Sequence, residues 1–134
     1  MTKNFKLNEF LESRFFSESE QIRVLADFEK NKKELLPKLQ KLANNLQVLR
    51  DALNASISIN IAYRPKWYEL LKGRSGNSRH CKCEAGDITV DGYTPLQVNS
   101  KIEELIKSGD MAEGGLGKYN SFTHYDIRGN KARW

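Results

Sequence analysis

The sequence predicts an α+β fold, in which helices come first and short strands then mix with one late helix. Leucines recur at helical spacing after Pro37, isoleucines alternate with polar residues over 57–61, and a helix-capping signal stands at Thr94. Helices followed by strands, without regular alternation of the two, favour α+β over a parallel α/β sheet. The chain has 134 residues, so we expect one domain spanning 1–134.

Three helices are predicted within residues 7–53. Leu7–Leu11 has the apolar spacing of a short helix, and the polar run 17–20 opens a second helix whose apolar residues fall in 22–28. A proline inside a helix removes a backbone hydrogen bond, so we expect the third and longest helix to start after Pro37. Its apolar face is made of Leu39, Leu42, Ala43, Leu46, Leu49 and Leu53.

Residues 56–134 are expected to form the sheet and the functional loops. A half-buried strand is predicted over 57–61, a short helix over 67–71 and a second strand over 87–90. The glycine-rich segment 114–117 is predicted to be a loop before a last strand at 122–128.

The late helix has the clearest boundaries of any element. Thr94 and Gln97 form the ends of a Thr-x-x-Gln capping box, and Pro95 suits the first turn. Gly109 stands where a glycine commonly ends a helix. The buried face is predicted to consist of Val98, Ile102, Leu105 and Ile106.

Composition and charge exclude several classes of protein. No apolar run approaches the roughly 18 residues that span a bilayer, so we expect no membrane insertion. Residues 1–5 have no apolar core of a signal peptide, so synthesis in the cytoplasm is expected. The net charge is +5, from 22 basic and 17 acidic residues, but the basic residues are scattered. We therefore expect no nucleic-acid partner.

The only two histidines of the chain, His80 and His124, are candidate metal ligands. Catalytic zinc sites commonly use three ligands of the histidine or carboxylate type and leave one position open. Cys81 and Cys83 offer a rival ligand set with His80, better suited to a structural metal. One residue apart, the cysteines would form a strained disulfide ring, so no disulfide is expected.

The surroundings of both histidines resemble a known family. Ser78-x-His80-x-x-x-x-Ala85-x-Asp87, followed by Phe122-x-His124-x-Asp126, resembles the zinc peptidases of the D-alanyl-D-alanine carboxypeptidase family, peptidase M15. This family shares its fold with the Hedgehog signalling domain, and the resemblance is to its compact phage or prophage type. Further matches to the family lie at Leu7–Phe10, Ile59–Arg64, Gly73–His80, Gly114–Gly117, His124–Gly129 and Ala132–Trp134.

The resemblance implies a Hedgehog/DD-peptidase-like fold, with a small antiparallel sheet carrying the metal site between flanking helices. It implies that His80, Asp87 and His124 bind one zinc ion per chain. The implied activity is hydrolysis of a peptide bond in peptidoglycan stem peptides by a monomeric, endolysin-like enzyme that acts on the cell wall. Trimming of terminal D-Ala, cleavage of L-Ala–D-Glu and opening of cross-links all remain possible reactions.

Three further residues receive roles from the resemblance. Tyr63, Arg64 and Ser78 are predicted to bind substrate, and Arg64 is predicted either to pair with a substrate carboxylate or to stabilise the developing oxyanion. The alternatives are a structural salt bridge for Arg64 and a turn for Ser78. Cys83 stands where the family usually has glycine, and a small cysteine is expected to pack there.

The general base is not supplied by the usual positions. Many relatives place Glu or His three residues before the last ligand, or His two residues before it, where this chain has Ser121 and Phe122. Asp126 is the nearest ionisable alternative, either as the base or as a carboxylate that orients a ligand. Glu84 and Glu113 are more distant candidates. The missing base keeps a second function open, namely a non-catalytic, zinc-containing module that binds cell wall.

Overall fold

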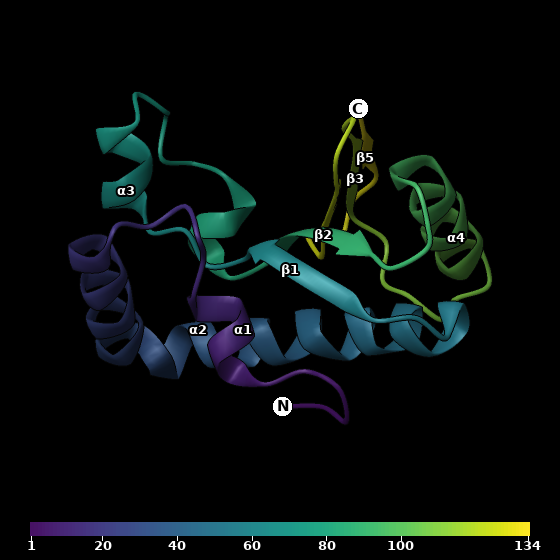
Figure 1. The fold of residues 1–134 in the computed structure, drawn as a ribbon, viewed down its shortest axis with the longest axis horizontal. Coiled ribbons are helices and arrows are strands. Elements are labelled where there is room, and N and C mark those ends of the chain that lie inside the picture. The colour runs from purple at the N-terminus through teal and green to yellow at the C-terminus, as the bar shows by residue number, and fades with distance from the viewer.

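A computed structural model describes residues 1–134 as four α-helices, one 3₁₀ helix and five strands (Figure 1). The predicted α+β class is confirmed. In chain order the elements are α1 (Leu7–Leu11), α2 (Glu18–Leu53), β1 (Ile57–Ile61), α3 (Lys66–Leu71), the 3₁₀ helix η1 (Arg79–Lys82), β2 (Ala85–Val90), α4 (Pro95–Lys107), β3 (Gly115–Lys118), β4 (Thr123–Asp126) and β5 (Ala132–Arg133).

Helix α2 is one helix of 36 residues, so the predicted break at Pro37 is wrong. Ser17 caps it by accepting a hydrogen bond from the Glu20 amide at 3.2 Å. Pro37 removes one hydrogen bond, but buried side chains on both sides, such as Phe28 and Leu39, keep both halves helical. Figure 1 shows the first, dark blue part of α2 at a steep angle to the remainder, which lies along the sheet.

The five strands form one sheet in the order β1-β2-β4-β3-β5. The pairs β1–β2, β2–β4 and β3–β4 are antiparallel, whereas β5 pairs parallel with β3, which the expectation of an antiparallel sheet did not include. The segment predicted to be a glycine-rich loop is strand β3. Its glycines are needed because a Cβ at Gly115 would collide with the Asp126 carboxylate, and one at Gly117 would collide with the Trp134 ring.

Helix α2 lies against one face of the sheet and leaves the opposite face uncovered by this helix (Figure 1). Gly86 of β2 lies over Leu42 and Leu46 of α2, and Tyr125 of β4 is fully buried. Helix α4, capped by Thr94 as predicted, contacts β2, β3 and β4. No helix is both long and apolar enough to cross a membrane.

Candidate metal centre

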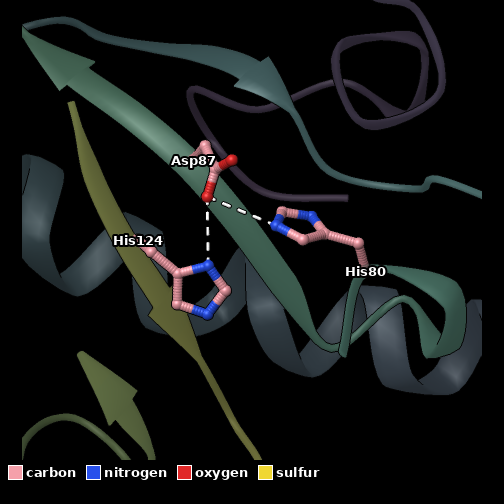
Figure 2. Close-up of side chains that lie close together, drawn as sticks. All are labelled: His80, Asp87 and His124. Carbon is pink, nitrogen blue, oxygen red and sulfur yellow. Dashed lines mark hydrogen bonds and ion pairs between the residues drawn. The ribbon is translucent and has the colours of Figure 1, made fainter. Parts of the chain in front are cut away.

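His80, Asp87 and His124 come together on the face of the sheet opposite α2 (Figure 2). Asp87 and His124 are direct cross-strand partners in β2 and β4, and His80 reaches them from η1. Oδ1 of Asp87 lies 3.3 Å from Nε2 of His80 and 3.0 Å from Nδ1 of His124. The three potential ligand atoms all lie within 4.8 Å of one another.

The backbone fixes His80. Its Nδ1 lies 2.9 Å from the carbonyl oxygen of Ala62, and because a carbonyl only accepts, Nδ1 carries the hydrogen and Nε2 is left free. The carbonyl of His80 in turn accepts a hydrogen bond from the Arg64 amide at 3.2 Å. After η1 the chain turns at Cys83, whose φ of 57° is left-handed, a conformation that favours glycine. The ring of His80 is thereby buried with one nitrogen aimed at Asp87.

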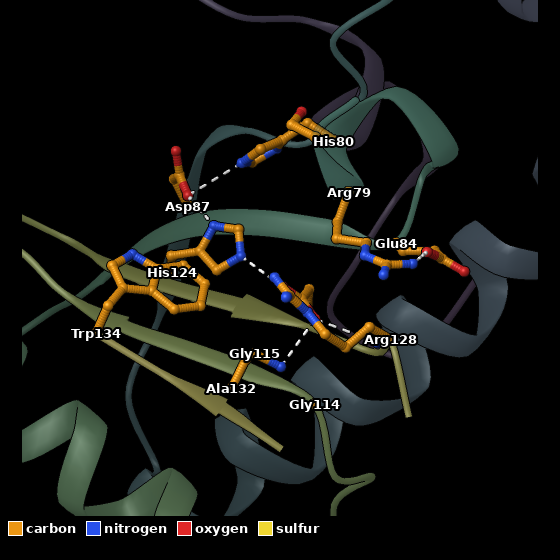
Figure 3. A network of polar contacts seen from close by, with 12 residues as sticks. Arg79, His80, Glu84, Asp87, Gly114, Gly115, His124, Arg128, Ala132 and Trp134 are labelled. Carbon is orange, nitrogen blue, oxygen red and sulfur yellow. Dashed lines mark hydrogen bonds and ion pairs between the residues drawn. The ribbon is translucent and has the colours of Figure 1, made fainter. Parts of the chain in front are cut away.

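A network of charged groups fixes His124 (Figure 3). Its Nε2 donates to Oδ2 of Asp126 at 2.7 Å, which leaves Nδ1 free to face Asp87. Arg128 donates to both oxygens of Asp126, from Nε at 2.9 Å and from Nη2 at 2.7 Å. The amide of Gly115 donates to Oδ1 of the same carboxylate at 2.8 Å. Asp126 is therefore a fully buried carboxylate with every oxygen bonded.

These contacts decide the ionisation of the groups. Burial disfavours the charged form of Asp126, but hydrogen bonds from His124 and Arg128 outweigh it and hold the pKa of Asp126 well below its usual range. Burial also opposes ionisation of Asp87, but hydrogen bonds and positive charge from His124 and His80, in the metal-free protein with both rings protonated, bring its pKa far down. For His124, burial lowers the pKa, but hydrogen bonds to Asp126 and Asp87 raise it overall. Asp87 is thus an anionic oxygen donor.

The donor set fits a divalent metal ion of the zinc type. Each histidine has one nitrogen tied to an acceptor and the other free, which is how ligating histidines are commonly oriented. Neither cysteine belongs to the cluster. Cys83 is buried in the apolar core, and burial raises the pKa of Cys81 to about 11. The geometry therefore gives the rival cysteine-containing set no support.

The cluster lies in a cleft with two arms that meet at Arg64, Arg74, Asp87 and Phe122. We call the arm lined by Arg14 the arginine arm and the arm lined by Trp134 the tryptophan arm. Their volumes are about 490 Å³ and about 480 Å³, respectively. The arginine arm is completed by Arg14, Phe15, Asn60, Ile61, Tyr68, Thr89 and Ser121. The tryptophan arm is completed by Asn77, Ser78, Arg79, His80, Tyr119, His124, Arg128 and Trp134. An extended ligand therefore has room on both sides of the cluster.

The family model of peptidase M15 matches residues 5–126, which is most of the chain and includes all three clustered residues. The protein belongs to the peptidase M15 family. Peptidases of this family are zinc-dependent, so membership supports a metallopeptidase, and it confirms the resemblance seen in the sequence. No curated protein and no solved structure matches the chain.

Arg64 lines both arms of the cleft. Its Nε donates to Glu69 at 2.7 Å, and no protein group bonds its two Nη atoms. Ser78 lines the tryptophan arm and donates its hydroxyl hydrogen to the same carboxylate. Glu69, which is only 1% exposed, thus fixes both residues, although nothing in the sequence singled it out.

Tyr63 does not lie in the cleft. Its hydroxyl donates to Asp27 of α2 at 2.7 Å, and its ring packs edge-on against Phe28. Burial and the Asp27 carboxylate raise the pKa of Tyr63 far above its usual range. The side chain is 3% exposed and lines neither arm, so the predicted contact with substrate is corrected to a core contact.

The acidic candidates for the general base all lie outside the cleft. Asp126 is fully buried and lines neither arm. Glu84 pairs with Arg79, and Glu113 bonds to Arg133. Asp87 is the only carboxylate that lines either arm.

The remaining cleft residues could not be identified from the sequence. Trp134 lies against the His124 ring at 4.9 Å between centroids (Figure 3). Its indole nitrogen donates to the Tyr119 hydroxyl at 2.7 Å. Arg14 reaches the cleft from the turn between α1 and α2, 66 positions before His80 in the sequence. The only local signal is the glycine-flanked loop around Arg74, which is typical of an exposed, functional segment.

Proposed function

We propose that this protein is a zinc-dependent metallopeptidase that hydrolyses peptide bonds in the stem peptides of peptidoglycan. The observation that carries the proposal is the convergence of three ligand atoms within 4.8 Å in a two-armed cleft, with Asp87 where the arms meet, in a chain of the M15 family. Resemblance to the compact phage type further supports a monomeric lysis enzyme that is made in the cytoplasm and acts on the cell wall.

Nε2 of His80, Oδ1 of Asp87 and Nδ1 of His124 would hold the zinc ion. A zinc ion bound there would polarise the scissile carbonyl and lower the pKa of a water molecule towards neutrality. The tautomers needed for binding are already set, because Ala62 and Asp126 occupy the other ring nitrogens. Little reorganisation is therefore required when the metal binds.

Arg64 acts on the carbonyl oxygen of the substrate. Glu69 holds its Nε, so the guanidinium plane is fixed while its two Nη atoms stay available to donate. Donors held in place before the reaction stabilise developing negative charge without further ordering. Ser78 has given its hydrogen to Glu69, so its oxygen is left to accept a hydrogen bond from a substrate amide.

Asp126 acts as a positioning residue and not as the base. A base must reach the proton that it removes, within hydrogen-bond distance or through one water molecule. Asp126 is fully buried, its oxygens are occupied by His124, Arg128 and Gly115, and its pKa is strongly lowered. These properties suit a carboxylate that fixes the tautomer of a metal ligand.

The absence of a second carboxylate in the cleft favours one alternative, a non-catalytic module that binds peptidoglycan through the same cleft. Purified peptidoglycan, incubated with the zinc-loaded protein, distinguishes the two functions by the release of free amines. Our proposal predicts release that a chelator stops, that added zinc restores and that His80→Ala lacks. Stoichiometric zinc without release from any peptidoglycan type would contradict the peptidase and establish the binding module.

A further inference from the structure

Five arginines line the cleft, and they differ in whether the protein neutralises them. Three have carboxylate partners: Arg64 with Glu69, Arg79 with Glu84 and Arg128 with Asp126. Arg14 and Arg74 have no ion-pair partner. Both of these line the arginine arm, where Asp87 is the only carboxylate and already contacts both histidines.

The backbone around Arg14 is fixed. Ser13 donates its hydroxyl to the carbonyl of Asn60 at 2.7 Å, and its amide donates to Gln21 of α2 at 3.0 Å. The guanidinium of Arg14 lies over the ring of Phe15, 4.8 Å from its centroid. The turn is thus tied to β1 and α2, while the charged group remains exposed at the arginine arm.

The backbone of Arg74 is also held. Its amide donates to the carbonyl of Glu69 at 2.8 Å, the same residue that fixes Arg64. Gly73 precedes it with a φ of 76°, which allows the chain to turn back sharply after α3. The side chain of Arg74 is exposed and lines both arms, next to the metal centre.

We propose that the arginine arm is a subsite for a free carboxylate of the substrate peptide, held by Arg14 and Arg74 beside the metal centre. Guanidinium groups recognise carboxylates through paired, charge-assisted hydrogen bonds. A neutral peptide would leave two like charges uncompensated beside a bound divalent cation, whereas a carboxylate compensates them. This inference rests on the proposed function for the kind of peptide, and it adds that the peptide is anionic next to the scissile bond.

The test uses three forms of one stem tetrapeptide, L-Ala-γ-D-Glu-L-Lys-D-Ala. The first form is unmodified, the second carries an amide in place of the D-Glu α-carboxylate, and the third carries a C-terminal amide. Dissociation constants are measured by NMR titration of the full-length protein, both loaded with zinc and after zinc removal, and cleavage is followed by mass spectrometry. Zinc removal excludes carboxylate binding by the metal as the source of any preference.

One of the two amidated forms is expected to bind about five- to tenfold more weakly than the unmodified peptide, with and without zinc. That form identifies the carboxylate that the arm recognises. Arg14→Gln and Arg74→Gln should each weaken binding of the unmodified peptide by a similar factor. Their dissociation constants for the weaker-binding amide should stay within about twofold of the wild-type value. Arg74→Lys, which keeps the charge, should recover part of the loss. Arg50→Gln is the matched control, because Arg50 lies on α2 and lines neither arm.

The outcomes separate this inference from the peptidase activity. The subsite would be overturned if all three peptides bound with equal dissociation constants and if Arg14→Gln and Arg74→Gln left these constants unchanged. This conclusion would hold even if the protein cleaved all three peptides. Carboxylate-selective binding that depends on both arginines, without cleavage of this tetrapeptide, would establish the subsite. The peptidase activity is then decided by amine release from whole peptidoglycan, because the tetrapeptide contains no D-Ala–D-Ala bond and no cross-link.

Discussion

The rings of His80 and His124 lie 5.2 Å apart, yet the protein fixes them by different means. His80 is held through main-chain groups, the carbonyl of Ala62 and the amide of Arg64. His124 is held through a buried carboxylate, Asp126, that Arg128 neutralises. Both arrangements leave one nitrogen facing Asp87, so the same orientation is reached once by backbone geometry and once by charge.

The His80 half and the His124 half of the site should therefore respond to different substitutions. A main-chain acceptor cannot be removed by a side-chain substitution, so the His80 half should respond mainly to changes in its turn and in the residues that support it. The His124 half depends on ionised side chains with little access to water, where the loss of one partner leaves the other unpaired. Single substitutions at Asp126 or Arg128 should therefore have large effects.

Removal of either histidine should reduce zinc affinity more than any other substitution, and the two losses should be similar. His80→Ala and His124→Ala each leave two of three ligands, so zinc affinity should fall more than about 100-fold, beyond the range typical for groups that only orient a ligand. Zinc content after equilibrium dialysis measures this. Cys81→Ala is the control, since Cys81 is adjacent to His80 but outside the cluster, and it should keep one zinc per chain. Loss of zinc in that control would restore the cysteine-containing site.

Asp126→Asn should weaken metal binding through His124 without replacing any of the three metal ligands. Zinc affinity is expected to fall about 10- to 100-fold, because the tautomer of His124 is no longer enforced. The free energy of unfolding should fall by about 3 kcal/mol, because Arg128 loses its buried partner. Isothermal titration with zinc and urea unfolding measure the two effects.

Asp91→Asn removes an exposed carboxylate in the turn after β2 and serves as the matched control for Asp126. It should change neither zinc affinity nor the free energy of unfolding appreciably. If Asp126→Asn behaved like this control, the charged network would have no role in holding His124.

Glu69→Gln should weaken the support of the His80 half through Arg64 and Ser78. Burial opposes ionisation of Glu69, but hydrogen bonds from Ser78 and Arg64 bring its pKa below the usual 4.5. A carboxyl whose pKa is lower in the folded state stabilises the fold above its unfolded pKa, and this contribution is lost as pH falls further. At pH 7 the free energy of unfolding of the wild type should exceed that of Glu69→Gln by about 2 kcal/mol. This difference should become smaller below pH 4.5. Urea unfolding over pH 3–7 tests it, and a pH-independent gap would contradict it.

Cys83→Gly should have the smallest effect. Glycine relieves the left-handed strain at φ 57°, worth about 1–2 kcal/mol, but it removes a buried side chain and makes the unfolded chain more flexible. The free energy of unfolding should therefore stay within about 1 kcal/mol of the wild type, as measured in urea. Cys83→Val, which adds a branched side chain at the same φ, is the contrasting variant and should be clearly destabilised. Equal stabilities for the three proteins would show that this turn carries no strain.

The sequence predicted those parts of the molecule that depend on local pattern. The strand at 57–61 and the helix after Thr94 follow from alternation and from a capping box, and both occur with the predicted boundaries to within a few residues. The continuity of α2 through Pro37 could not be predicted, because it depends on burial of side chains on both sides of the proline. Strand β3 was missed because its glycines reflect the close approach of Asp126 and Trp134, which only the tertiary structure reveals.

The candidate site divides in the same way. The resemblance to the family implied the set His80, Asp87 and His124, and the structure brings these residues together, with Asp87 and His124 as cross-strand partners. Arg14 and Glu69 reach the site from other elements with no motif of their own. Tyr63 adjoins Arg64 in sequence but points to α2, because neighbouring residues of an extended segment face opposite sides.

Binding of one zinc ion by His80, Asp87 and His124 can be observed by anomalous X-ray diffraction at the zinc edge from crystals of the zinc-loaded protein. We expect one anomalous peak per chain, about 2.0–2.2 Å from Nε2 of His80, Oδ1 of Asp87 and Nδ1 of His124. A peak bound by Cys81 or Cys83, or by Nε2 of His124 in place of Nδ1, would contradict it.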